Sequence, residues 1–68
     1  MLTDKQRDQI EALRRDAGAH QDWHMVAICE RALDPDAAVA LIWDLSQEEA
    51  LAKCEHVIAA AKAAEEDR

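Results

Sequence analysis

Three histidines and two cysteines are the side chains in this sequence with the most scope for chemistry. His20 and His24 lie four residues apart, and Cys29, Cys54 and His56 follow later in the chain. Imidazole nitrogens and thiolate sulfurs are the ligands of structural zinc sites. A zinc-stabilised domain is therefore one alternative, although the sequence has no Cys-x-x-Cys unit. We expect instead exposed histidines, buried reduced cysteines, no bound metal and no cofactor.

Catalysis by a cysteine–histidine pair is not expected. Both cysteines fall on apolar stripes, where burial raises the pKa of a thiol and keeps it in its weakly nucleophilic form. The single glycine of the chain is too few for a phosphate-binding loop. These features predict a protein that is not an enzyme.

The composition predicts an all-α fold, a small bundle of three to four short helices forming a single domain over residues 1–68. Half of the residues are hydrophobic, many of them alanine, and the chain has one Gly and one Pro. Alanine is the strongest helix former and packs poorly in strands. Because so short a chain buries only about 60% of the surface it exposes when unfolded, its stability is expected to be small.

The first two helices are predicted from capping signals. Thr3 and Gln6 form a capping box, and Gly18 is expected to end the first helix. The apolar stripe of this helix is Ile10, Leu13 and Ala17. A second helix is predicted from Trp23 to about Leu33 with Asp22 as its cap; apolar residues almost encircle it, so it should be the most buried.

Two further helices are predicted in the second half of the chain. Asp34 is expected to cap a short helix that starts at Pro35 and ends near Asp44. Its apolar residues 37–43 are more than one side of a short helix can hide, which indicates a surface for a partner. A last helix is predicted to follow the capping box of Ser46 and Glu49 and to reach about residue 64. Its expected buried stripe is Ala50, Leu51, Cys54, Val57, Ile58 and Ala61.

The negative charge is concentrated in one part of the chain. The net charge is −7, yet residues 1–21 hold four acids and four bases and are balanced. No base occurs between Arg31 and Lys53, whereas five acids do. The predicted partner-binding residues combine these acids with apolar anchors: Asp34, Asp36, Leu41, Trp43, Asp44, Glu48 and Glu49.

Two interpretations of these residues carry similar weight. In the first, the acids steer a basic protein onto an aromatic anchor, Trp43. In the second, the acids stabilise the positive ends of helices and keep the chain soluble, and Trp43 belongs to the core. Anionic lipid and nucleic acid would repel the net charge, so neither a membrane nor direct nucleic-acid binding is expected. The polar N-terminus lacks a signal peptide, which favours a cytoplasmic protein.

The segment Asp16–His20, followed by Met25–Leu33, resembles short uncharacterised acidic helical proteins of bacteriophages and bacterial mobile elements. This resemblance implies a genomic context and no catalytic residue. Small acidic proteins from that context include inhibitors of host nucleic-acid machinery, anti-CRISPR proteins among them, which occupy basic DNA- or RNA-binding surfaces. The leading hypothesis is therefore an inhibitor that docks on a basic, nucleic-acid-handling host protein. A structural homodimer that buries the apolar segment 37–43 is the alternative.

Overall fold

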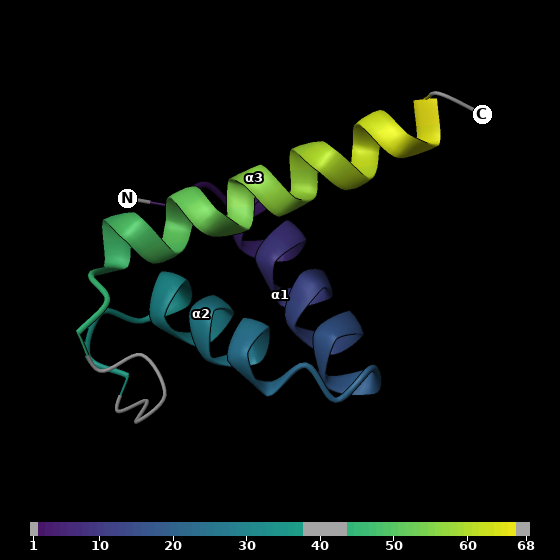
Figure 1. The fold of residues 1–68 in the computed structure, drawn as a ribbon. Helices are drawn as coiled ribbons and strands as arrows, with labels where there is room; N and C mark the ends of the chain where they lie inside the picture. The colour runs from purple at the N-terminus through teal and green to yellow at the C-terminus, as the bar shows by residue number, and fades with distance from the viewer. Residues whose placement is uncertain (1, 38–43, 67–68) are drawn as a thin grey trace.

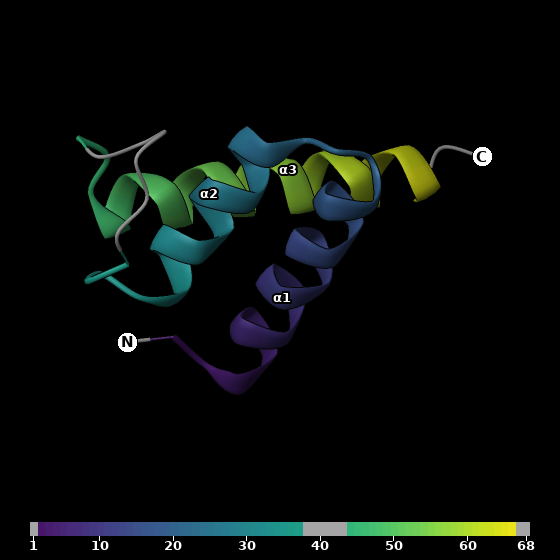
Figure 2. The same ribbon diagram turned by 90° about the horizontal axis from the view of Figure 1, so that it is seen from below.

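The protein is all-helical in the residues that its computed structural model describes, 2–37 and 44–66 (Figure 1). The helices are α1 (Asp4–Ala19), α2 (Trp23–Leu33) and α3 (Gln47–Glu66). Figures 1 and 2 show α1 and α2 as a V-shaped pair with α3 lying across both. The predicted fold class is confirmed.

The predicted short helix from Pro35 to about Asp44 falls largely on residues 38–43, which lie outside the described residues. At its described edges the backbone is not helical. Pro35 and Asp36 are in a turn, Ala37 has no regular structure, and Asp44 is in a turn. The prediction that a helix starts at Pro35 is therefore wrong.

The start of α1 confirms the predicted capping box. Thr3 Oγ1 accepts a hydrogen bond from the Gln6 N–H at 3.1 Å, and Gln6 Oε1 accepts one from the Thr3 N–H at 2.9 Å. Two N–H groups that the first helical turn leaves free are satisfied in this way. The predicted stripe is also found, with Ile10 and Ala17 buried and Leu13 partly buried.

The end of α1 differs from the prediction. Gly18 is helical, and the left-handed residue is Gln21, with φ 59°. The Asp22 N–H donates to Ala17 O at 2.8 Å, and the Gln21 N–H donates to Gly18 O at 3.1 Å. This pair of bonds is the Schellman motif, whose left-handed position is usually glycine. The chain therefore places a glutamine where backbone geometry favours glycine, which is why the position of Gly18 misled the prediction.

Helix α2 lies between α1 and α3 and contributes half of the buried core. Its cap is as predicted, because Asp22 Oδ1 accepts a hydrogen bond from the Met25 N–H at 3.3 Å. Its buried residues are Ala27, Ile28, Cys29 and Ala32. Trp23 is an exception to the expected burial of the apolar residues of this helix, since 59% of it is exposed. It is the first residue of the helix.

The fully buried residues of helix α3 lie in its first half. Ala50 and Cys54 are fully buried, and Leu51, Val57 and Ile58 are partly buried. Ala61 is exposed, contrary to the predicted stripe, because it borders an open groove that separates this part of α3 from α1. The helix also reaches Glu66, two residues past its predicted end.

The core is made mostly of small side chains. Ile10 and Ile28 are its only large members among the described residues. The others are Ala17, Ala27, Cys29, Ala32, Ala50 and Cys54. Small residues allow helix axes to approach closely, because the distance between packed helices depends on the side chains at the contact.

Candidate functional site

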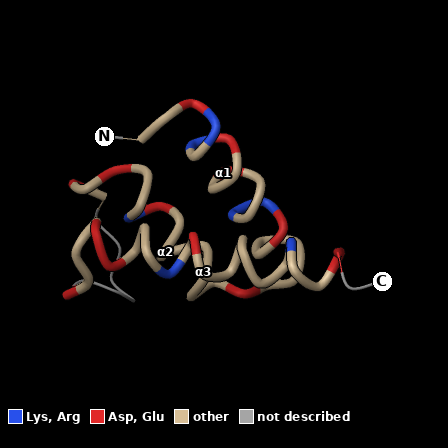
Figure 3. Tube along the Cα trace, turned by 90° about the horizontal axis from the view of Figure 1, so that it is seen from above, with Lys and Arg blue, Asp and Glu red and all other residues tan. Residues whose placement is uncertain are grey.

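Five predicted site residues lie at one end of the molecule, where α2 ends and α3 begins. We call this group the acidic end: Asp34, Asp36, Asp44, Glu48 and Glu49, all of them exposed. Figure 3 shows the acidic segments gathered there, whereas α1 carries both colours. The two apolar site residues, Leu41 and Trp43, lie outside the described residues. The structure therefore groups the acids but does not describe the anchor.

Asp34 acts as a turn residue, not as the predicted helix cap. Its Oδ1 accepts a hydrogen bond from the Asp36 N–H at 3.0 Å, and its carbonyl oxygen accepts one from the Ala37 N–H at 3.1 Å. Pro35 occupies the second position of this turn, where its fixed φ is favourable. The turn leaves Asp34 and Asp36 exposed just beyond the end of α2.

Ser46 begins α3 largely as predicted. Its Oγ accepts a hydrogen bond from the Glu49 N–H at 3.2 Å, and its hydroxyl lies 3.3 Å from Glu49 Oε1. Glu48 and Glu49 occupy the first turn of α3, where the helix dipole stabilises negative charge. Their positions are therefore explained in part by the helix itself.

The arginine nearest in sequence to this turn is engaged with the backbone. Arg31 Nη1 donates a hydrogen bond to Pro35 O at 2.7 Å. This contact holds the guanidinium beneath the turn, while the carboxylates of Asp34 and Asp36 are not its hydrogen-bond partners in the described structure. The acids of the turn thus keep their charge available to solvent.

The histidines and cysteines do not form a ligand cluster. His20, His24 and His56 are exposed, whereas Cys29 and Cys54 are fully buried. Within residues 2–37 and 44–66 there is no group of three or more His, Cys, Asp or Glu side chains able to hold a metal ion. The zinc alternative has no ligand set in this part of the chain.

The two cysteines contact each other at the crossing of α2 and α3. The Cys54 thiol donates a hydrogen bond to Cys29 Sγ, and the two sulfur atoms are 3.8 Å apart. When this pair loses a proton, the remaining one stays on Cys29 and hydrogen-bonds Cys54, so this hydrogen bond, together with burial, raises the pKa of the Cys29 thiol well above its usual range and lowers that of Cys54. Cys29 is therefore a neutral thiol near pH 7, which does not suit it to be a nucleophile.

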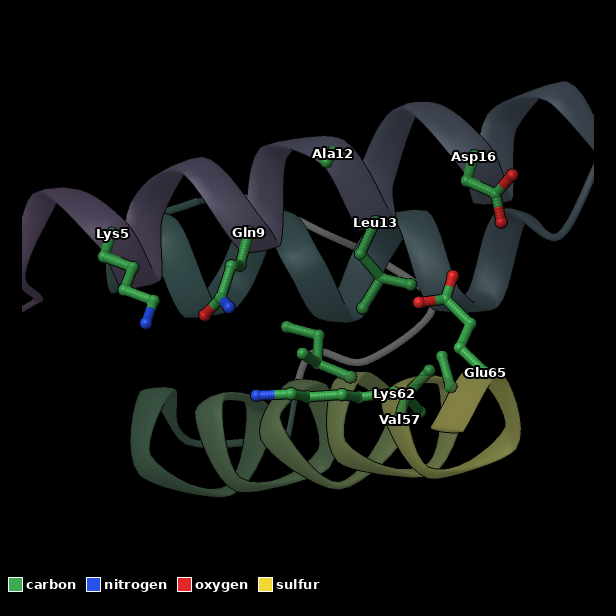
Figure 4. Close-up of a pocket in the computed structure, with 10 residues that line it drawn as sticks. Lys5, Gln9, Ala12, Leu13, Asp16, Val57, Lys62 and Glu65 are labelled. Atoms are coloured by element: carbon green, nitrogen blue, oxygen red, sulfur yellow. The ribbon is translucent and has the colours of Figure 1, made fainter. Parts of the chain in front are cut away.

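A groove between α1 and the second half of α3 was not predicted. Its volume is about 540 Å³, and its apolar floor includes Leu13, Val57 and Ile58. Figure 4 shows the ammonium groups of Lys5 and Lys62 toward one side and the carboxylates of Asp16 and Glu65 toward the other. The sequence indicates each stripe separately, but the angle between the helices, which opens the groove, is a tertiary feature.

Trp23 is a second feature that the sequence did not single out as a surface residue. It is the only large hydrophobic side chain that is exposed in the described part of the chain. Aromatic residues are common anchors of protein interfaces. Its place directly after the cap Asp22, at the corner between α1 and α2, is the signal that would have indicated an exposed position.

No helix in the described residues is both long and apolar enough to cross a membrane. Comparisons of the chain with models of known protein families, with curated protein sequences and with solved structures found no match.

Proposed function

We propose that the protein is a small acidic protein-binding module, an inhibitor of the anti-CRISPR kind from a phage or mobile element. It docks the acidic end on a basic, nucleic-acid-binding surface of a host protein. The observation that carries this proposal is the gathering of five exposed acids where α2 ends and α3 begins. They come from two segments that the fold places at the same end of the molecule.

The chemistry of such a partner follows from the carboxylates. Arginine and lysine side chains that hold phosphate groups also form charge-assisted hydrogen bonds with carboxylates. A cluster of one sign attracts a basic partner over roughly the Debye length, about 8 Å at physiological ionic strength. Binding of this kind gains association rate from the charges and weakens as salt is added.

The experiment is a capture from bacterial lysate on the immobilised protein at low and high ionic strength, followed by affinity measurements on the retained protein. We expect a basic, nucleic-acid-handling protein that is released by salt and competes with its own nucleic acid for the chain. Retention that is insensitive to salt would contradict the proposal.

A matched pair of variants localises the interaction. The first replaces the five acids of the acidic end by their amides, Asp→Asn and Glu→Gln. These amides keep the acceptor oxygens that the turn at Asp34 and the cap at Glu49 require. The control makes the same change at five exposed acids elsewhere: Asp8, Asp16, Glu55, Glu65 and Glu66.

Both variants lose the same net charge. The proposal expects the first to weaken binding at least about tenfold and the control to weaken it much less, because close charge pairs matter more than net charge. Equal losses of affinity in the two variants would show that binding depends only on the net charge and not on the acidic end.

The groove between α1 and α3 favours a second candidate, a structural homodimer. A two-fold axis through the middle of the groove sets the lysine side of one copy against the carboxylate side of the other. The apolar floor then loses its contact with water, which drives association.

Analytical ultracentrifugation over micromolar concentrations tests this candidate. Ala61 lines the groove, whereas the neighbouring Ala60 is exposed and is not part of its lining. If the protein dimerises through the groove, Ala61→Glu yields a monomer and Ala60→Glu leaves the dimer intact. A strict monomer in the unmodified protein removes the candidate.

A further inference from the structure

The buried cysteine pair takes no part in the proposed binding surface. Cys29 comes from α2 and Cys54 from α3, 25 residues apart in the chain, and each is 0% exposed. Both are free thiols whose sulfur atoms are 3.8 Å apart. Two oxidisable sulfurs in van der Waals contact on different helices are a specific arrangement, since the described core has only eight buried members.

We infer that Cys29 and Cys54 are a redox modification site, which a small-molecule disulfide such as oxidised glutathione converts into an intramolecular disulfide between α2 and α3. A disulfide requires the sulfurs to approach to about 2.05 Å. The surrounding residues favour this change. Ala32 and Ala50 belong to the same buried cluster, and such small side chains offer little resistance to rotation of the thiols or to a slight approach of the helices.

The reaction consists of two exchange steps. One cysteine thiolate attacks the disulfide of the oxidant, so that a mixed disulfide forms and one small thiolate leaves and takes up a proton. The second cysteine loses its proton and attacks the cysteine sulfur of the mixed disulfide, and the second small thiol leaves. The two cysteine sulfurs are oxidised, and the oxidant is reduced to two thiols that carry the two protons.

Burial controls the rate of this reaction. The oxidant cannot reach a thiol that is 0% exposed, so the first step follows an opening of the α2–α3 crossing. Once formed, the disulfide closes the loop of residues 30–53, which contains every member of the acidic end. Oxidation therefore ties both ends of the binding segment to the core, whatever that segment binds.

The test compares the native and the unfolded chain. Reduced protein is equilibrated with mixtures of reduced and oxidised glutathione, in buffer and in concentrated urea. Free thiols are then alkylated, and mass spectrometry gives the fraction of intramolecular disulfide. The free energy by which the disulfide stabilises the folded state equals the free energy by which folding favours disulfide formation. We therefore expect the equilibrium constant for forming the intramolecular disulfide to be at least about 100-fold larger in buffer than in urea.

A thermal unfolding experiment gives an independent measurement. The oxidised protein is expected to unfold about 10–20 °C above the reduced protein, and dithiothreitol should reverse the shift. The single variants Cys29→Ala and Cys54→Ala should show neither the intramolecular bond nor the shift.

Three results would overturn the inference: an equilibrium constant no larger in buffer than in urea, an oxidised form that melts below the reduced one, or products limited to mixed disulfides and intermolecular dimers. The equilibrium measurement uses the unmodified chain, so it decides the matter even if the alanine variants fold poorly.

Discussion

The two halves of α3 both contain alanine but have opposite surroundings. Residues 47–54 include Ala50 and Cys54, which are fully buried against the other helices. Residues 59–66 include five alanines, and all eight residues are exposed. Alanine is therefore a core residue at position 50, whereas Ala52 and the five alanines of the second half are surface residues.

This difference shows that neighbours, not residue type, decide what α3 buries. The first half lies across α2, whereas the second half continues past it (Figure 1). Alanine serves both halves because its helix propensity needs no partner and its small side chain allows close packing where a partner exists. Changes at the two halves should consequently have very different effects.

The largest expected effect comes from adding bulk to the buried half. Ala50→Leu places a larger side chain where no space is free and should lower the free energy of unfolding by about 1–3 kcal/mol. Ala60→Leu makes the same change at an exposed position and should alter it by no more than about 0.5 kcal/mol. Urea unfolding of both variants measures the contrast, and equal effects would show that the two halves do not differ in packing.

A pH series tests the buried contact between α2 and the first half of α3 through the thiols of Cys29 and Cys54. The raised pKa of Cys29 means that the folded protein keeps a proton which the unfolded chain releases above about pH 8.5, whereas the lowered pKa of Cys54 contributes stability that is fully present above that pH. Above about pH 8.5 the Cys54 contribution is constant and that of Cys29 is lost as the pH rises, at up to about 1.4 kcal/mol per pH unit. Urea unfolding in the presence of reductant measures the loss. The Cys29→Ala/Cys54→Ala double variant is the control, and an identical pH dependence there would exclude the thiol as its source.

In the turn after α1, the effect of a substitution on stability depends on backbone conformation and not on packing. Gln21 is exposed and adopts the left-handed conformation at φ 59°. Gln21→Gly removes the steric cost of a side chain in that region and should raise stability by about 1 kcal/mol. Gln21→Ala, which keeps a Cβ atom, is the control and should bring no such gain. Thermal unfolding of the two variants separates them.

Gly18 of α1 is partly buried, so its packing is intermediate between that of the two halves of α3. It is helical, and an added Cβ would meet only Val26 Cγ2, at 4.0 Å, which is an ordinary contact. Gly18→Ala should therefore raise stability by about 0.5–1 kcal/mol through helix propensity. Gly18→Leu adds bulk toward Val26 and should lose part of this gain. A destabilised Gly18→Ala would mean that the α1–α2 corner is packed more tightly than the 4.0 Å contact indicates.

Local signals predicted the helix starts well. The caps at Thr3 and Asp22 use hydrogen bonds between residues three apart, so a short stretch of sequence is enough to predict them. The end of α1 and the segment after Asp34 were less predictable, because glutamine adopted a conformation typical of glycine and a proline turn replaced a helix start.

The candidate site was predictable only in part. The five acids stand out as a stretch without bases, and their exposure at one end follows from the helix ends that they occupy. The groove depends on the angle between α1 and α3, and the exposure of Trp23 depends on which side of α2 the other helices cover. Neither property is contained in the periodicity of a single helix.

The sequence by itself determined the helical class, the starts of α1, α2 and α3 and the regional negative charge, because helix propensity, capping and charge depend on residues close together in the chain. Only the tertiary structure decided which alanines are buried, that Cys29 meets Cys54, and that α1 and α3 diverge to leave a groove. These features require contacts between segments that are far apart in sequence, and in a core of small side chains many packing arrangements are compatible with the same local pattern.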